Sequence, residues 1–79
     1  MIVQLFAGAR EVVGAASIHL NLSAGATVAD LRHALIHDHP ELSPLLARSR
    51  IAVNQEFADD SAVVPDGAEV ALIPPVSGG

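Results

Sequence analysis

Two stretches near the start of the chain alternate hydrophobic and polar residues with a period of two, which is typical of half-buried β-strands. They cover residues 2–7 and 17–22. Their spacing suits a hairpin, and residues 8–14, which contain Arg10 and Glu11, are expected to form the connecting loop. The side chains expected to face the core are Val3, Leu5, Ala7, Ile18, Leu20 and Leu22.

A helix is predicted after this hairpin. The sequence Thr-Val-Ala-Asp at 27–30 matches a capping box, which makes Thr27 the expected N-cap. Because Pro40 cannot continue a helix, the helix should end near His39. Its hydrophobic stripe at helical spacing consists of Val28, Leu31 and Leu35.

The second half of the chain predicts a connector followed by three strands. Residues 41–48 place leucines around a proline and are expected to form an irregular or 3₁₀-like connector. Strands are expected at 51–53, 56–58 and 69–73, with a turn at Asn54-Gln55. Inward-facing positions should be Ile51, Val53, Val70 and Leu72, and outward-facing positions Arg50, Ala52, Glu69, Ala71 and Ile73.

These elements together predict an α+β fold, a mixed sheet of four to five strands with one main helix packed on one face. Two prolines end the last strand, since proline supplies no ladder donor. Residues 1–73 are therefore expected to form the domain and residues 74–79 an extended tail. A chain of 79 residues can bury one compact core but not a deep catalytic pocket.

Composition narrows the classes of function. The net charge is −5, with no lysine and four arginines, so the chain lacks the basic stripe of a nucleic-acid-binding protein. The acidic balance suggests a basic partner surface or simple solubility. The chain has no cysteine, and no apolar run approaches the ~20 residues of a membrane span. The N-terminus does not resemble a signal peptide, and a cytoplasmic location is expected.

No cluster of side chains makes a convincing catalytic or metal site. His33, His37 and His39 lie close together in the sequence, but neither an HExxH motif nor a cysteine accompanies them, which favours a solvated helix end. Three aspartates lie in predicted turns, where Asp is common for local hydrogen bonding. The serines lack a G-x-S-x-G context.

The outward face of the predicted sheet carries hydrophobic residues. Phe6 shares its face with Gln4, and Ile73 shares its face with Glu69, so this face should be exposed to solvent. Phe57, which follows the turn, is expected to join them. Exposed apolar groups on a small protein often mark an interface. The alternative is that a short strand has the opposite parity and buries these side chains.

The chain ends in Pro-Pro-Val-Ser-Gly-Gly at 74–79. Gly78 and Gly79 have no Cβ atoms and can enter a channel too narrow for other residues. The two prolines favour an extended polyproline II exit from the sheet, and Val76 can anchor the tail by apolar contact. A terminal carboxylate, with a pKa near ~3.5, is inert until it is activated. The alternative is an ordinary frayed terminus.

Several motifs along the whole chain together resemble one known family. They are Phe6-Ala7 with Arg10-Glu11 and Gly14, Thr27-Val28 with Leu31, Val53-Asn54-Gln55, and Asp66-Gly67-x-Glu69-Val70-Ala71 running into Pro-Pro-Val-Ser-Gly-Gly. In these the chain resembles the small, sulfur-carrier subunits of molybdopterin synthases, within the MoaD/ThiS ubiquitin-like family. The last segment is the most specific, because thiamine-pathway carriers usually lack the Pro-Pro. Leu72 and Ile73 stand where aromatics are common in the family.

This resemblance implies a β-grasp fold and a sulfur-carrying cycle. An E1-like enzyme would adenylate Gly79 with ATP, and a sulfur donor would convert the adenylate to a thiocarboxylate. The tail, with Gly78 inside the channel, would insert into the large synthase subunit, which builds the dithiolene of molybdopterin in an assembly of two small and two large subunits. The carrier would hold no tightly bound cofactor. The implied partner-binding residues are Phe6, Phe57, Ile73, Pro74, Pro75, Val76 and Ser77.

Three other functions stay open. The first is a sulfur carrier for thiamine, cysteine or tRNA thiolation. The second is a protein modifier that forms isopeptide bonds through Gly79, as ubiquitin does. The third is a binding module in which the tail has no role.

Overall fold

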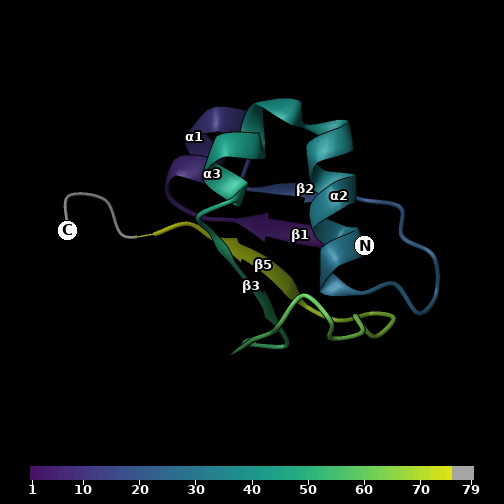
Figure 1. Cartoon of the computed structure of the whole chain (residues 1–79). Helices are drawn as coiled ribbons and strands as arrows, with labels where there is room; N and C mark the ends of the chain where they lie inside the picture. The colour runs from purple at the N-terminus through teal and green to yellow at the C-terminus, as the bar shows by residue number, and fades with distance from the viewer. Residues whose placement is uncertain (76–79) are drawn as a thin grey trace.

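The strands follow the order β2-β1-β5-β3-β4, in which the parallel neighbours β1 and β5 are flanked by antiparallel pairs. The structure is a computed structural model that describes residues 1–75. Within that range the helices lie on one face of the five-stranded sheet (Figure 1). The elements are β1 (Ile2–Leu5), α1 (Gly8–Val13), β2 (Ser17–His19), α2 (Val28–Asp38), η1 (Pro40–Leu42), α3 (Ser43–Leu46), β3 (Arg50–Val53), β4 (Glu56–Phe57) and β5 (Val70–Ile73). The predicted α+β, β-grasp fold is confirmed.

The core lies between the inner face of the sheet and the helices. From α2 the predicted stripe is confirmed, since Val28, Leu31 and Leu35 are fully buried. They meet inward-facing strand residues that are also buried: Val3, Leu5, Ile51, Val70 and Leu72. Burying one such aliphatic side chain stabilises the fold by about 1.5–3 kcal/mol. The core is aliphatic because the two phenylalanines lie outside it.

The start of α2 carries the predicted capping box. The backbone N–H of Asp30 donates to Oγ1 of Thr27 at 3.2 Å, and the N–H of Thr27 donates to Oδ2 of Asp30 at 2.9 Å. The backbone hydrogen bond from Thr27, followed by the bond to its side chain, lowers the pKa of the Asp30 carboxyl from its ordinary value of 3.8. The prediction of Thr27 as the N-cap is therefore confirmed.

Two predictions about the first hairpin were wrong. The connection expected as a loop is the helix α1, which buries Ala9, ends at Val13 and is capped by Gly14 with a φ of 81°. The second strand ends at His19 and not at residue 22, because β1 offers no further partner once the Leu20 N–H has bonded the carbonyl of Met1.

Ala7 was expected to face the core but is exposed. Its φ of 47° and ψ of −124° turn the chain out of β1 and into α1, which breaks the alternation of the strand.

The predicted connector is built from η1 and α3. Arg32 of α2 fixes the end of this connector. The two terminal nitrogens of the Arg32 guanidinium donate to the carbonyls of Leu46 and Ser49, each at 2.8 Å. Its Nε donates to Oδ1 of Asp60 at 3.0 Å. Arg32 thus satisfies carbonyls at the end of α3 and ties this segment to α2.

Candidate functional site

The outer face of the sheet carries an apolar hollow of about 230 Å³. We call its hydrophobic lining the outer patch, formed by Phe6, Ala52, Phe57, Ala71 and Ile73. The side chains of Gln4, Gln55 and Glu69 also line it. The strands bring these groups together because Ala52 lies opposite both Ala71 and Phe57 in its two ladders. Phe6 is 44% exposed and Phe57 is 53% exposed, so the predicted parity of these strands is confirmed.

Arg50 lies at one border of the outer patch. It pairs with Ile73 across β3 and β5, and its guanidinium carbon lies 3.7 Å from the centroid of the Phe57 ring. A cation at this distance is attracted by the ring and gains about 0.5–1 kcal/mol at an exposed site. The contact fixes both side chains on the outer face.

The turn between β3 and β4 forms another border. Asn54 and Gln55 have φ values of 51° and 70°, the left-handed pair that a tight hairpin turn requires. Asn54 is held in place because its N–H donates to the Glu69 carbonyl at 2.7 Å and its Oδ1 accepts from the Glu69 N–H at 2.9 Å. Gln55 has an unfavourable backbone for a residue with a Cβ, and its side chain lines the hollow.

The tail leaves the sheet at the end of β5, next to the outer patch. Pro74 is buried, and with Pro75 it lines a cavity of about 270 Å³, which we call the tail-root cavity. The other lining residues come from the Ala7 turn, α1 and the α3 region: Ala7, Gly8, Glu11, Leu45 and Arg48. Seating Pro74 here fixes the direction in which the chain departs.

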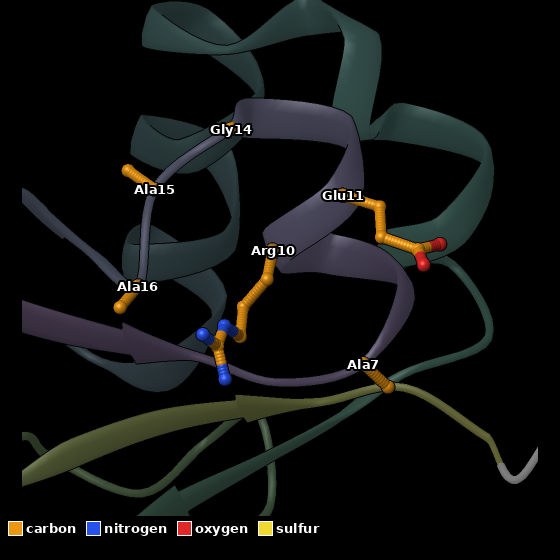
Figure 2. A pocket seen from close by; sticks show the side chains of 6 residues that line it. All are labelled: Ala7, Arg10, Glu11, Gly14, Ala15 and Ala16. Carbon is orange, nitrogen blue, oxygen red and sulfur yellow. The ribbon is translucent and has the colours of Figure 1, made fainter.

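A wider cavity of about 500 Å³ lies beside α1. Figure 2 shows Arg10 extending from α1 towards the strands while Glu11 points to the other side of the helix. The remaining lining residues, Ala7, Gly14, Ala15 and Ala16, carry no reactive side chain. The cavity thus offers one cation and one carboxylate that do not face each other, which is no arrangement for acid–base catalysis.

The predicted site residues divide into two groups. Phe6, Phe57 and Ile73 come together in one hollow, with Pro74 and Pro75 directly after Ile73. The residues predicted to carry sulfur or to enter a partner lie outside the described residues: Val76, Ser77, Gly78 and Gly79.

Other chemistry finds no support in the part of the chain that the structure describes. Residues 1–75 contain no group of three or more His, Cys, Asp or Glu side chains arranged to hold a metal ion. His37 and His39 instead approach Asp38 at 3.2 Å and Glu41 at 3.6 Å. No helix among the described residues is long and apolar enough to cross a bilayer.

The period of two predicts Ala52 and Ala71 on the outer face but does not identify them as the floor of a hollow. Nor does it identify Arg50 and Gln55 as border residues. A signal exists for Gln55, because a two-residue turn needs two positive φ values whatever its sequence. The contact of Arg50 with Phe57 depends on strand register, which no local motif reveals.

Comparison with known proteins places the chain in a family. A molybdopterin synthase sulfur carrier subunit of Chlamydomonas reinhardtii is 40% identical over 79 residues, covering 98% of this chain and 95% of that protein. Its namesake from Arabidopsis thaliana is 38% identical over 77 residues, covering 98% and 80%. The small archaeal modifier protein 1 of Haloferax volcanii is 34% identical over 84 residues, covering 96% and 97%.

The fold comparison agrees with the sequence comparison. The crystal structure of SAMP1 from Haloferax volcanii superposes with a TM-score of 0.88 at 34% identity, covering 100% of this chain and 98% of that one. The model of the ThiS family matches residues 3–79, nearly the whole sequence. The chain therefore belongs to the ThiS family.

Proposed function

We propose that this protein is the sulfur carrier of molybdopterin biosynthesis and that Gly79 is the residue that carries the sulfur. The observation that supports this most is the match over nearly the full length to relatives that are named molybdopterin synthase sulfur carrier subunits. The outer patch and the seated Pro74 add a physical reason. A carrier needs a surface for docking and a defined exit for its tail, and the two lie side by side at the end of β5.

The chemistry belongs to the terminal carboxylate. In the activating step, an oxygen of the Gly79 carboxylate attacks the α-phosphate of ATP, and pyrophosphate leaves. The resulting acyl adenylate has a good leaving group. The terminal sulfur of a donor persulfide then attacks the acyl carbon and displaces AMP, which gives an acyl disulfide. A second thiol attacks the donor's sulfur, so that a disulfide forms on the donor side and the thiocarboxylate leaves on Gly79. The carrier supplies the acyl group, and the partner's preorganised groups stabilise the charge that develops.

Two partners follow from this cycle. An E1-like enzyme binds ATP and activates the tail, and a large synthase subunit accepts it in an assembly of two small and two large subunits. Both have to present an apolar surface to the outer patch, because Phe6 and Phe57 are about half exposed in the free chain. Gly78 and Gly79 would enter the narrow part of the channel, and Val76 and Ser77 would line its entrance.

Intact mass spectrometry tests the proposal. The chain is incubated with ATP, the E1-like enzyme of its own organism and a sulfur donor, and the expected change is replacement of one oxygen by sulfur at Gly79. A chain that lacks Gly79 should keep its melting temperature and remain unmodified. An unchanged mass of the full chain with a demonstrably active enzyme would refute the carrier function.

A second candidate function is protein modification. It is favoured by the likeness to the small archaeal modifier protein 1 of Haloferax volcanii. Covalent conjugates that contain the Gly79 carbonyl in an isopeptide bond would support it. A carrier for another sulfur pathway would give the same thiocarboxylate but would not bind the large synthase subunit, so a pull-down with that subunit separates the two carriers.

A further inference from the structure

Two of the four arginines border the point where the tail leaves the sheet, and a third lies beside α1. The chain has four arginines and no lysine. One of them, Arg32, is engaged inside the fold by Asp60 and two carbonyls. Within residues 1–75 none of the remaining three forms an ion pair. We call these three the basic rim: Arg10, Arg48 and Arg50.

Arg50 places the basic rim against the outer patch. It is paired with Ile73, the last residue of β5, and is stacked on Phe57 at 3.7 Å. Stacking leaves the edge of the planar guanidinium, with its N–H groups, free to donate outward. A partner that covers Phe57 therefore meets the donors of Arg50 at the same time.

The other two members lie along the departing chain. Arg48 lines the tail-root cavity together with Pro74 and Pro75. Arg10 lines the adjoining cavity, and Ala7 is common to both cavities. Figure 2 shows the side chain of Arg10 reaching from α1 towards the strands. Arg50 and Arg48 thus border the tail root on the sheet side and the α3 side, and Arg10 lies beside α1, next to the Ala7 turn.

Two acidic side chains lie at the far end of the last strand. Glu69 and Asp66 precede β5, at the end of the sheet opposite to the tail root. The carboxylate of Asp60 is paired with Arg32 at 3.0 Å. Glu11 lines both the tail-root cavity and the cavity beside α1. In a chain with a net charge of −5, three arginines without an ion pair among the described residues therefore lie around these two cavities and the end of β5, together with one glutamate.

We infer that the basic rim binds an acidic border around the tail-accepting channel of the large synthase subunit. This inference rests on the proposed function, because it requires the tail to enter a partner. Bringing the arginines against a neutral or basic border would leave them without partners, and like charges that face each other across an interface oppose binding. The same border repels the acidic remainder of the carrier. Encounters in which the tail root of the carrier faces the channel of the large subunit are therefore favoured.

Association kinetics test the inference with the full chain and the purified large synthase subunit of its own organism. The triple variant Arg10→Gln, Arg48→Gln and Arg50→Gln should associate about tenfold more slowly than the natural chain at about 10 mM salt, where the Debye length is about 30 Å. At about 1 M salt, where this length is about 3 Å, the difference should vanish.

Two control variants separate local charge from net charge and from fold. Asn21→Asp with Ala24→Glu and Ser61→Glu lowers the net charge by the same three units at exposed loop positions away from the tail root. This control should associate within about threefold of the natural chain. Replacing the three arginines by lysine keeps the charge and should restore most of the rate. Thermal unfolding verifies that every variant is folded.

The possible results distinguish a failure of the basic-rim inference from a failure of the proposed function. Equal slowing by the glutamine variant and the loop variant would show that only net charge matters and would overturn the basic rim. Unchanged association of the glutamine variant would overturn it as well. If the natural chain does not bind the large subunit at all, the proposed function fails and the inference fails with it.

Discussion

The two faces of β5 differ in burial, although the strand has only four residues. Val70 and Leu72 point inward and are fully buried, whereas Ala71 and Ile73 point outward and line an open hollow. The inner face meets α2 and large aliphatic side chains. The outer face has two small alanines at its centre and phenylalanines that are about half exposed.

This difference separates, within a chain of 79 residues, the face that stabilises the fold from the face that we propose docks a partner. The sheet is one layer, so a change on one face should leave the other largely intact. Stability should depend on the inner face, and binding on the outer face and the tail root. Variants on each face test whether that separation holds.

The largest effect is expected on the inner face. Leu35→Ala removes a fully buried side chain from α2 and should lower the free energy of unfolding by about 2–5 kcal/mol. Denaturant titration measures this loss. While the variant remains folded, its association with the large subunit should be unchanged. A binding defect in the folded fraction would show that the faces are coupled.

On the outer face, Phe57→Ala should weaken binding far more than it weakens the fold. Loss of an aromatic anchor typically costs about 2 kcal/mol of binding, or about thirtyfold in Kd. The free energy of unfolding should fall by only about 1 kcal/mol, since the ring is 53% exposed and loses mainly its contact with Arg50. Calorimetry of binding and of unfolding gives the two numbers. Val63→Ala, at a residue that is 56% exposed and outside the hollow, is the matched control and should change neither.

The turn at the border of the patch should show a smaller effect of the opposite sign. Gln55→Gly relieves a left-handed backbone and should raise the free energy of unfolding by about 1 kcal/mol. Asn54→Gly, in the same turn, removes the Oδ1 that accepts from the Glu69 N–H and should not stabilise the fold. Equal stabilisation by both changes would mean that this hydrogen bond has no net value.

The smallest effect concerns the capping box, far from the outer patch. Bonds from Thr27 lower the pKa of Asp30 in the folded state. The stability they contribute is present above the ordinary value of 3.8 and is lost as the pH falls through the lowered pKa. Asp30→Asn should therefore be less stable than the natural chain at neutral pH, and the difference should close in strong acid. Urea titrations across this range measure it, and a constant difference would contradict the assignment.

The sequence was sufficient for the parts of the fold that are governed by local rules. A capping box and a stripe at helical spacing defined α2, and a period of two assigned inner and outer faces around Phe6, Ile51 and Leu72. These patterns are strong because each follows from the geometry of one element.

The missed features depend on contacts between elements. Helix α1 has only six residues, starts with a glycine, and follows a backbone reversal at Ala7 that no residue preference predicts. The end of β2 depends on how far its partner strand extends. Arg50 meets Phe57 only because β3 and β4 pair in one register. The basic rim could not be predicted from the sequence either, because its three arginines come together only in the tertiary structure.

The alanine floor of the hollow has a consequence for engineering. Because Ala52 and Ala71 carry nothing beyond Cβ, a valine or leucine at either position would fill the hollow from below while leaving the inner face untouched. Under the proposed docking at the outer patch, such a protrusion would exclude the natural partner by steric clash, and a partner with a matching truncation would accept it. These two positions are therefore where we expect an orthogonal pair of carrier and partner to be obtainable without any change to the tail.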